Sequence, residues 1–567
     1  MPFNYKIYPF QTPPELRGEP EQIYDVTIIG AGPVGLTLAL SLAQQGVKCV
    51  ILDDNNQVGI GSRAICFAKR SLEIFDKLGV AKPMIELGVQ WNVGRIFFKE
   101  NEIHRFDLSP EKLSKYPAFI NLQQYYVETF LIEAVLKNEN IDVRWLNKVV
   151  HLGTNSNTQQ NQILDVETSE GNYTLKTKYL VACDGSRSTI RSMMNLEMVG
   201  NRFEERFLIA DFKMEADFPS ERWFWFDPPF APGQSILLHK QPDNIWRLDF
   251  KLGKNADSSI AENKDFLKEK IKSVVGERSF ELDWTSVYSF SSKMLERFVH
   301  GRVIFAGDSA HVVSPFGARG ANSGIEDADN LAWKLVKIIK NEAPEAILET
   351  YNAERTAAAK QNIACTGETN TFIAPPSEKG TMLRNEILEK AATDIAAKKQ
   401  INCGRLSVPS IYGKYPNSEM GYWKNNDLAP GRAVKDCFIN NKVIFEDRSK
   451  NTFLIEKLKS EFTILTLKHT LSESDIKKLK SHNINVLEIN QLENAPLMTL
   501  FEMGFEQVYL ITPDQYVLGR WEEFKPQFAI DLVKKYLSGQ IFEAMTLQKS
   551  EQELIDAAVT EQILASF

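Results

Sequence analysis

The sequence of 567 residues has few cysteines, and they follow no pairing or ligand pattern. The six are scattered and none forms a CxxC pair; they are Cys49, Cys66, Cys183, Cys365, Cys403 and Cys437. This spacing argues against a disulfide framework and a cysteine-based zinc site, and it is typical of buried thiols in a reducing compartment. We therefore expect no metal site.

Long hydrophobic runs are absent as well. The longest apolar stretch, residues 26–43, is interrupted by three glycines and a proline. It is typical of a strand, a turn and a helix rather than of a membrane span. The N-terminal segment shows no apolar core of a secretory signal. We expect a cytoplasmic protein without an integral membrane segment.

Basic residues are outnumbered. Lys and Arg total 66 against 74 Asp and Glu, which gives a net charge of −8, and no run of five or six like charges occurs. This balance argues against nucleic acid as a partner, because nucleic-acid-binding surfaces are basic. With 43% hydrophobic and 25% charged residues, the composition is that of an ordinary globular protein. The length suggests about three domains.

A glycine-rich segment near the N-terminus carries the first chemical signal. A β-branched run at residues 25–29 is followed by Gly-Ala-Gly-Pro-Val-Gly at 30–35, a helical pattern, and a second apolar run ending at Asp53. In such a βαβ unit Gly30 permits a tight turn, Gly32 lets a pyrophosphate approach, and Gly35 lets helix and strand pack closely. Asp53 suits a ribose hydroxyl. The alternative is a glycine-rich turn that binds nothing.

Two further strand-and-turn motifs lie downstream. An apolar run from residue 178 ends in Asp184-Gly185, with Arg191 beyond it. Another run from residue 301 ends in Gly307-Asp308, and a second glycine-rich loop at 315–324 then opens a helix. The alternative role for Asp308 is a cap on the helix that follows. His311 is interpreted as structural rather than as a catalytic base.

In this order, the three motifs resemble those of single-component FAD-dependent aromatic hydroxylases, the class A flavoprotein monooxygenases. The resemblance covers essentially residues 20–540 and is strongest to the 3-(3-hydroxyphenyl)propionate and phenol hydroxylase branch. It implies FAD as cofactor and NAD(P)H as co-substrate. The cofactor-binding residues implied are Gly30, Gly32, Pro33, Gly35, Asp53, Arg63, Gln124, Asp184, Gly185, Arg191, Gly307, Asp308, Pro315, Gly317, Gly320 and Asn322.

The resemblance also implies a reaction. NAD(P)H reduces FAD, O2 forms a flavin C4a-hydroperoxide, and its distal oxygen attacks a phenolic or related aromatic ring. Because the chemistry centres on the flavin, no side chain is assigned as catalytic, and Pro315 and Arg319 are expected near the isoalloxazine. Many relatives carry Gly-Gly-Gln-Gly where this chain has Gly-Ala-Arg-Gly, and Glu where it has Asp53. The alternatives are an oxidase, reductase or epoxidase of a non-aromatic substrate, or a non-catalytic flavin-binding protein.

The expected fold is α/β (α+β overall). It comprises a Rossmann-type FAD-binding domain, an inserted mixed-sheet substrate domain and a C-terminal thioredoxin-like domain without CxxC. The domains are predicted at residues 20–200 and 291–400 (FAD-binding), 201–290 (substrate sheet), 401–435 (linker), 436–545 (thioredoxin-like) and 546–567 (tail). The aromatic stretch 223–230 is either strand core or a wall of the substrate pocket. The expected partners are a small aromatic substrate, NAD(P)H and O2, and a homodimer is considered.

Overall fold

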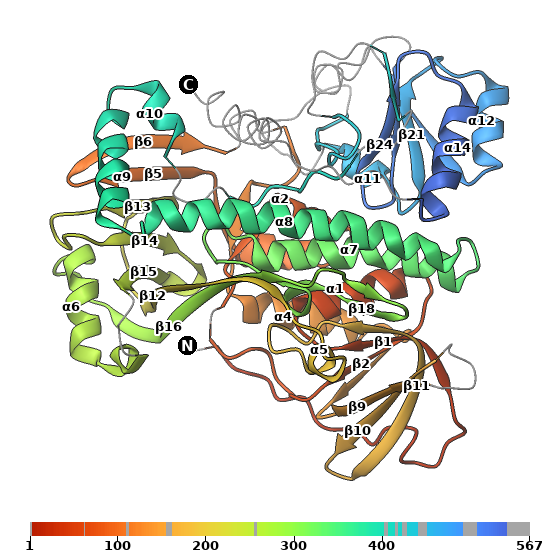
Figure 1. Ribbon diagram of the computed structural model, residues 1–567, viewed down its shortest axis with the longest axis horizontal. Helices are drawn as coiled ribbons and strands as arrows, with labels where there is room; N and C mark the ends of the chain where they lie inside the picture. The colour runs from red at the N-terminus through yellow and green to blue at the C-terminus, as the bar shows by residue number, and fades with distance from the viewer. Residues whose placement is uncertain are drawn as a thin grey trace.

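The computed structural model describes residues 3–61, 63–108, 113–154, 161–253, 258–401, 406–413, 418–421, 428–439, 451–490 and 507–540. These residues form four β-sheets, of which one is mainly parallel, one crosses the middle of the molecule, one lies near the C-terminus and one is small. Two long helices, α7 (Gly320–Ile339) and α8 (Leu348–Ile373), run side by side across the centre (Figure 1). The predicted tail, 546–567, lies outside the described residues.

The first sheet is built around parallel strands. Its order is β17 (Val299–His300), β18 (Val303–Phe305), β11 (Gly171–Ala182), β1 (Ile23–Ile29), β2 (Cys49–Asp53) and β8 (Ile141–Trp145). Antiparallel strands β9 (Lys148–Thr154) and β10 (Gln162–Thr168) extend from β11. The central strands are buried along most of their length, which is why they are apolar runs rather than alternating patterns. The predicted βαβ unit is confirmed.

Helices cover the parallel sheet. Helix α1 (Pro33–Gln44) packs against α7 and α4 (Gln124–Val135), and α2 (Lys69–Lys77) packs against α7 and α3 (Ala81–Leu87). The short α5 (Thr189–Met193) follows β11 and contacts β9. Strands β3 (Cys66–Ala68), β7 (Phe119–Asn121) and β4 (Val89–Trp91) form the small sheet next to these helices. Except for β4, whose Trp91 packs in a separate small cluster, these elements share one hydrophobic core with the parallel sheet.

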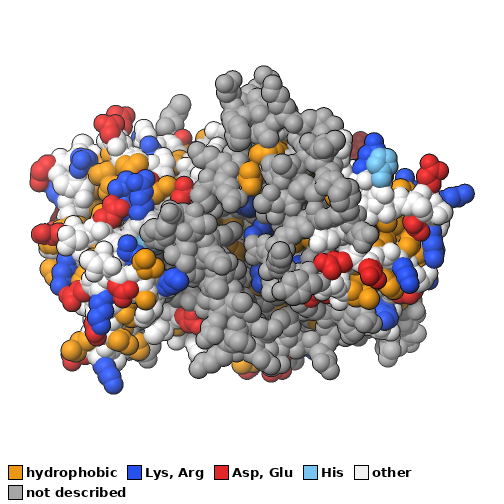
Figure 2. Space-filling model, turned by 90° about the horizontal axis from the view of Figure 1, so that it is seen from above, with side chains coloured by type: hydrophobic (Ala, Val, Ile, Leu, Met, Phe, Trp, Pro, Cys, Tyr) orange, Lys and Arg blue, Asp and Glu red, His pale blue; other side chains and the backbone are white. Residues whose placement is uncertain are grey.

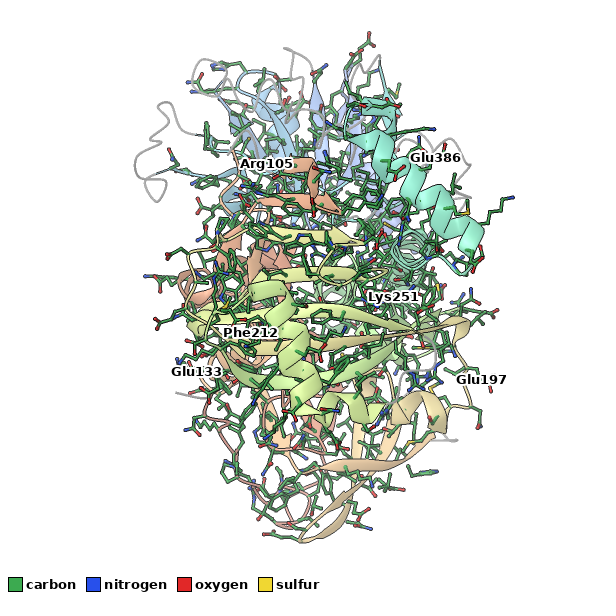
Figure 3. The ribbon with its side chains drawn as sticks, turned by 90° about the vertical axis from the view of Figure 1, so that its left-hand side faces the viewer. Arg105, Glu133, Glu197, Phe212, Lys251 and Glu386 are labelled. Atoms are coloured by element: carbon green, nitrogen blue, oxygen red, sulfur yellow. The ribbon has the colours of Figure 1, made fainter. Side chains whose placement is uncertain are left out.

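The middle sheet has eight strands. Its order is β19 (His311–Val312), β16 (Glu281–Met294), β12 (Val199–Lys213), β15 (Ile245–Gly253), β14 (Ser235–Lys240), β13 (Arg222–Phe226), β5 (Val93–Phe98) and β6 (Asn101–Asp107). Strands β5 and β6 come from within the predicted first domain, so the sheet extends beyond residues 201–290. Helix α6 (Lys264–Val275) lies across the outer face, beside Phe212 (Figure 3). Helices α9 (Glu378–Ala391) and α10 (Ile395–Lys399) pack near the β5–β6 end.

The C-terminal sheet has the order β20 (Glu419–Met420), β24 (Val517–Trp521), β23 (Val508–Ile511), β21 (Phe462–Leu467) and β22 (Ile484–Ile489). Helices α11 (Leu454–Lys457), α12 (Glu473–Lys480) and α14 (Pro526–Leu537) accompany it. Part of the predicted linker pairs with this unit, because the amide of Val434 donates to the carbonyl of Gln515 and the amide of Val517 donates to that of Arg432.

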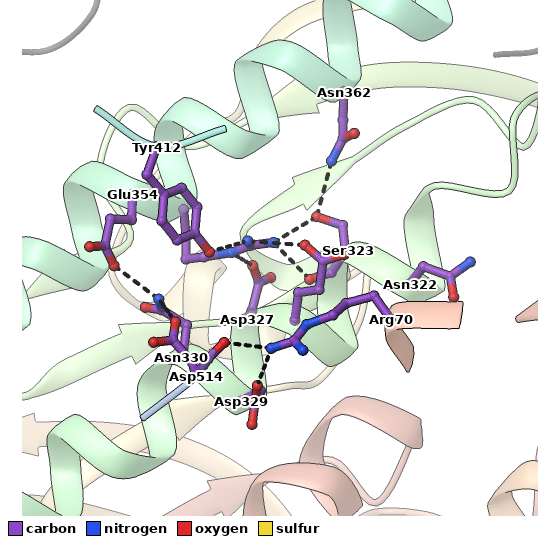
Figure 4. Close-up of polar contacts among 12 residues, drawn as sticks. Arg70, Asn322, Ser323, Asp327, Asp329, Asn330, Glu354, Asn362, Tyr412 and Asp514 are labelled. Carbon is purple, nitrogen blue, oxygen red and sulfur yellow. Dashed lines mark hydrogen bonds and ion pairs between the residues drawn. The ribbon is translucent and has the colours of Figure 1, made fainter. Parts of the chain in front are cut away.

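A buried polar network joins the C-terminal sheet to α2, α7 and α8 (Figure 4). Arg70 pairs with Asp329 and donates to the backbone carbonyl of Asp514. Lys334 lies 2.7 Å from Glu354, which also accepts from Tyr536. Further bonds run from Asn330 to Asp514 and from Arg355 to Asp327 and Tyr412. We call this set the α7–α8 network; its charges are partnered by groups from distant parts of the chain.

The surface carries charges of both signs. Figure 2 shows basic and acidic side chains interspersed with apolar ones over the described parts of one face. Among the residues that the structure describes, no helix is both long enough and apolar enough to cross a membrane. The same part of the chain contains no cluster of three or more His, Cys, Asp or Glu side chains arranged to hold a metal ion.

Candidate cofactor and substrate site

The three sequence motifs meet at one edge of the parallel sheet. Strands β1, β2, β11 and β18 run parallel, so their carboxyl ends lie together, where α/β proteins bind their ligands. Backbone hydrogen bonds link the residues that follow these strands. The amide of Gly30 donates to Leu52, that of Cys183 to Ile29, and that of Ala306 to Ala182, over 2.8–3.1 Å. Residues far apart in sequence are thereby placed side by side.

The first loop is shaped by close backbone approaches. Gly30 has φ +104°, and a Cβ there would lie 2.5 Å from the carbonyl oxygen of Cys183. A Cβ on Gly35 would lie 2.1 Å from the oxygen of Gly30, so only glycine fits. Gly32 has open space around it and caps α1 without a side-chain hydrogen bond, and Pro33 begins the helix. The first amides of α1 are therefore available to a phosphate.

Asp53 lies beside this loop at the end of β2. Its Oδ2 accepts from the amide of Ala31 at 2.6 Å, and its Oδ1 accepts from Asn55 at 2.8 Å. Burial raises the pKa of Asp53 to about 6, although both amides favour the carboxylate. Each carboxylate oxygen keeps a lone pair for a further donor such as a ribose hydroxyl.

In the second motif, one carboxylate oxygen of Asp184 has no hydrogen-bond partner among the residues that the structure describes. Oδ2 of Asp184 accepts from the Thr189 hydroxyl and the Ile190 amide, both at 3.2 Å. Its Oδ1 is buried without a hydrogen-bond partner. Gly185 has φ +76°, which turns the chain after β11. Arg191 donates to the carbonyls of Ser186 and Ser309, so its guanidinium fastens this turn to the third motif.

The third motif is tied to the first through one side chain. A Cβ on Gly307 would lie 2.9 Å from Cγ2 of Val34, and a Cβ on Gly324 would lie 2.6 Å from the same atom. Val34, in the first loop, therefore packs between a glycine of the Gly-Asp turn and a glycine of α7. This contact sets the spacing of the first and third motifs.

Asp308 makes no hydrogen bond with any residue that the structure describes, and its side chain is exposed. The 3-10 turn Gly307–Ser309 is capped by Ala306 without a side-chain bond, so the capping role considered for Asp308 is not seen. Surrounding protein nevertheless raises the pKa of Asp308, while His311 and Arg63 act in the opposite direction. The Asp308 carboxylate is thus an acceptor that the described residues leave open to a ligand.

The second glycine-rich loop is fixed by Asn322. Its Oδ1 accepts from the Ala68 amide and the Ser71 hydroxyl, and its Nδ2 donates to the carbonyls of Cys66 and Ala318. An amide side chain makes four such bonds at most, so Asn322 has none left for a ligand. Its side chain positions the loop, and only its backbone remains for a cofactor.

The other residues of this loop differ in their surroundings. Pro315 is exposed and Gly317 has φ +95°, while Gly320 begins α7. The Arg319 side chain is buried and donates to Asn362 and to the carbonyl of Leu406. Its guanidinium is thus held by protein groups.

Arg63 and Gln124 approach the site from a fourth segment. Arg63 is exposed, its carbonyl accepts from Arg247 of the middle sheet at 3.1 Å, and its charge reaches Asp308. Gln124 accepts from the amide of Ala64 and donates to Glu128. Glu128 in turn accepts from the amide of Gly59, so the Gln124 side chain stabilises the segment that carries Arg63.

A buried cluster behind the third motif was missed by the sequence analysis. Asp327 accepts from the Gly307 amide at 2.9 Å, from His311 at 2.6 Å and from Arg355 at 2.5 Å. These bonds hold the pKa of Asp327 below its usual value despite its burial. The ring of His311 also stacks on Phe298. His311 therefore has a structural position, whereas no local pattern in the sequence marks Arg355 as its neighbour.

The middle sheet turns one face toward these loops. Phe316, in the second glycine-rich loop, packs edge-on against Phe207 with ring centroids 4.9 Å apart, and also contacts Phe290. On the same face Arg247 binds the carbonyl of Arg63. The sheet is thus attached to two cofactor-site segments. Phe224 and Phe226 of the aromatic stretch belong to the same cluster, whereas Trp225 packs on the outer face.

These features fit a dinucleotide cofactor. A glycine cradle stands beside the first turn of a helix, which suits a pyrophosphate. Asp53 retains acceptor capacity for a ribose, and Asp184 and Asp308 offer oxygens without protein partners. The acceptors lie on neighbouring strand ends, as an extended ligand requires.

Comparison with known proteins identifies the cofactor. Residues 23–366 match a family model described as FAD binding domain. The chain is 24% identical over 517 residues to a 3-(3-hydroxy-phenyl)propionate/3-hydroxycinnamic acid hydroxylase of Mycolicibacterium gilvum (strain PYR-GCK), which covers 87% of this chain and 88% of that protein. It is 29% identical over 354 residues to a probable NADH-specific resorcinol 4-hydroxylase of Rhodococcus jostii (strain RHA1), covering 61% and 64%.

A solved structure extends the agreement to the fold. The flavin-dependent monooxygenase PieE, in complex with FAD and substrate, aligns with a TM-score of 0.74 at 19% identity, covering 92% of this chain and 100% of that one. The family match spans more than half of the chain and includes all three motifs. The chain therefore belongs to the FAD-binding domain family and is an FAD-dependent monooxygenase of class A.

Proposed function

We propose that the protein hydroxylates a phenolic or related aromatic substrate, with NAD(P)H as reductant and O2 as oxidant. The observation that carries this proposal is the placement of an aromatic-rich sheet face over three converging cofactor motifs. Phe316 and Arg63, one from each side of the site, both contact that face. The chain has no second GxGxxG unit for a nicotinamide dinucleotide, as in class A enzymes.

The proposed cofactor contacts follow from the available groups. Gly30, Gly32, Pro33, Gly35 and Asp53 hold the ADP half, and Asp308 accepts from the ribityl chain. Backbone amides of Gly317 and Gly320 approach the flavin ring near Pro315. Asp184 supplies its free oxygen, and Gly185, Arg191, Gln124 and Asn322 position the segments that make contact.

The bound flavin supplies hydride acceptance and oxygen activation, and the protein supplies orientation and exclusion of water. Phe207, Phe290 and Phe316 form an apolar cluster between sheet and loop. Such a cluster keeps water from the reacting atoms, which protects a reactive oxygen species from unproductive decay. No side chain is required as a proton donor or acceptor at the oxygen.

We also propose that the C-terminal unit is thioredoxin-like and stabilises the assembly. Its parallel pair β21–β22 with α12 between them, the antiparallel hairpin β23–β24 and the following α14 support this. The absence of CxxC from the sequence removes thiol redox chemistry. The α7–α8 network supports a stabilising role. The domain boundaries predicted from the sequence belong to the same proposal, with β5 and β6 joined to the substrate sheet and residues 432–434 joined to the C-terminal unit.

The test measures coupling between substrate and flavin reduction. FAD-loaded protein is mixed anaerobically with NADH or NADPH, with and without each member of a phenol panel. A suitable phenol should speed flavin reduction at least about tenfold, equivalent to roughly 1.4 kcal/mol of barrier. With labelled O2, one oxygen atom should appear in the ring product and the other in water.

Either of two outcomes would overturn the proposal. Fast reduction without any phenol, with hydrogen peroxide as the only oxygen product, would identify an oxidase. Product from a non-aromatic alkene instead of a phenol would identify an epoxidase on the same fold.

A further inference from the structure

The inner face of the middle sheet carries polar side chains in neighbouring positions. In β15, Trp246, Leu248 and Phe250 pack on the outer face with α6, so Arg247 and Asp249 point to the inner face. Across the strands, Arg247 pairs in register with His239 of β14. Arg222 begins β13, next to β14. Arg222, His239 and Asp249 therefore come from three adjacent strands; we call them the inner polar wall.

Arg222 is a buried cation that no described side chain binds directly, although its charge acts on Asp249. Its side chain is 6% exposed, and it makes no hydrogen bond or ion pair with any residue in the described part of the chain. Arg247, on the same face, shows the usual arrangement: two of its nitrogens bind the Asp211 carboxylate at 2.7 and 2.9 Å. A buried guanidinium left without an acceptor is costly, and such groups are normally paired.

The other two members of the wall are also unsatisfied. Oδ1 of Asp249 and Nδ1 of His239 are buried without hydrogen-bond partners. Burial, reinforced by Arg222 and Arg247, lowers the pKa of His239, so its imidazole is neutral near pH 7 and has an acceptor nitrogen. The Asp249 residue is partly exposed to solvent. The surrounding protein still desolvates its carboxylate, which raises the pKa of Asp249 to about 6. The charges of Arg247 and Arg222 act on that pKa in the opposite direction.

The wall lies on the side of the cofactor site. Asp249 follows Arg247, which binds the carbonyl of Arg63, by two residues along β15. Asp249 also pairs across the sheet with Ile209, two residues from Phe207, which contacts Phe316. Asp249 therefore lies between the two contacts that fasten the sheet to the cofactor loops.

An electrostatic influence on Cys66 places Arg222 in the same region. The charges of Arg222, Arg247 and Asp249 all act on the Cys66 thiol. The backbone carbonyl of Cys66 is held by Asn322, at the start of α7. Arg222 thus lies close to the small sheet where it meets the second glycine-rich loop.

We propose that Arg222 binds the acid group of the substrate, and that His239 and Asp249 accept a hydrogen bond from its ring hydroxyl. This inference rests on the proposed hydroxylase function and names its substrate class: a hydroxylated aromatic acid. A guanidinium offers five donors and binds a carboxylate through two parallel hydrogen bonds. The two acceptors beside it complement a hydroxyl donor rather than a second acid.

A dinucleotide phosphate is the other anion that could reach a guanidinium in this enzyme. The acidic substrate is favoured because Arg222 belongs to the same wall as two hydrogen-bond acceptors. A hydroxylated aromatic acid offers both an anion and a hydroxyl donor, whereas a phosphate group offers acceptors only. The experiment therefore measures NAD(P)H as well as the acid.

The test compares acids with their neutral esters at equilibrium. FAD-loaded protein, without reductant, is titrated with 3-hydroxybenzoate, 3-hydroxyphenylacetate and 3-(3-hydroxyphenyl)propionate and with their methyl esters, and binding is followed by the flavin absorbance. The wild-type protein should bind at least one acid ten-fold or more tightly than its ester. Arg222→Met should weaken that acid about 10–100-fold, or roughly 1.4–2.7 kcal/mol, and change the ester less than about threefold.

Two variants control the measurement. Arg105→Met removes one positive charge from exposed β6 of the same sheet and should leave the acid-to-ester ratio unchanged. Arg222→Lys keeps the charge and should restore part of the acid preference. Because binding is read without turnover, a protein that hydroxylates none of these compounds still gives a result on Arg222.

Three results would overturn the assignment. These are equal binding of acid and ester by the wild type, an unchanged acid preference in Arg222→Met, and an effect of Arg222→Met on the KM for NADH or NADPH with acid binding unaffected. The last would assign Arg222 to the dinucleotide. The ratio of acid to ester is internal to each variant, so partial loss of folded protein does not obscure it.

Discussion

The α7–α8 network and the inner polar wall both bury charged side chains, but they treat them differently. In the network Arg355 is fully buried and binds Asp327, Ser323 and the Tyr412 hydroxyl. In the wall Arg222 is almost as deeply buried and has no such partner within the described residues. The cost of burying a guanidinium is offset by the protein in the first case only.

This difference indicates which buried charges hold the fold together and which belong to a ligand site. A partnered buried charge fixes the arrangement of secondary-structure elements, as Lys334 and Glu354 do between α7 and α8. A buried charge without a partner raises the free energy of the ligand-free protein. Binding of a ligand of opposite charge removes that cost. Four predictions test this distinction.

The largest effect is expected in the network. Arg355→Met leaves the buried Asp327 carboxylate without its guanidinium, which should lower the free energy of unfolding by about 3–5 kcal/mol. Denaturant unfolding followed by circular dichroism measures it. Lys390→Met removes a fully exposed ion pair with Glu386 and serves as control, with little change expected. A loss as small in Arg355→Met as in the control would contradict the role given to the network.

Asp308 should act on the cofactor. Asp308→Ala removes an acceptor without a protein partner, so the apoprotein should keep its stability while FAD dissociates about 10–100-fold more readily, or 1.5–3 kcal/mol. Fluorescence titration of apoprotein with FAD measures the affinity. Asp394→Ala, which removes the cap of α10, provides the contrast: it should cost stability and leave FAD affinity unchanged. An Asp308 variant with unaltered FAD affinity would remove this residue from the site.

Asp53 predicts a pH dependence of FAD binding. Its pKa is about 6 in the structure, and a ribose hydroxyl donating to it lowers the pKa in the complex. FAD binding then releases a proton, so affinity should rise by up to about tenfold per pH unit below pH 6 and level off above it. Asp53→Asn should flatten this rise. An equally steep profile in the variant would assign the titration to another group, such as Asp308.

The smallest effect is expected for Arg222 in the empty protein. Because Arg222 makes no hydrogen bond or ion pair with a described residue, Arg222→Met should change the free energy of unfolding by less than about 1 kcal/mol, or increase it. Denaturant unfolding followed by circular dichroism measures this change as well. A loss comparable to that of Arg355→Met would mean that the wall, like the network, is held together by its charges.

Local motifs made much of the cofactor site predictable. The turn at Gly30, the approach at Gly35 and the acceptor Asp53 are dictated by one βαβ unit, and the structure shows that unit. The Gly307-Asp308 turn also follows its strand directly. Asn322 was predicted to bind the cofactor because it lies in a matching motif, but its side chain hydrogen-bonds to other protein groups instead.

Contacts between distant segments were not predictable. Arg70 and Asp514 are 444 residues apart and carry no shared pattern, yet they meet in the α7–α8 network. Strands β5 and β6 join a sheet that starts a hundred residues later, because a parallel pairing with β13 is set by tertiary packing rather than by local sequence. The inner polar wall likewise emerges only from the register of three strands.

The contact of Val34 with two glycines has a consequence for how this sequence can drift. Position 34 tolerates many residues in a fingerprint, but here its size is matched to Gly307 and Gly324. A methyl group added at position 324 would require a smaller residue at position 34. A bulkier residue at position 34 would clash with the backbone, because positions 307 and 324 are already glycine and cannot become smaller. These positions should therefore change together among descendants of this chain, so the first and third motifs evolve as one unit.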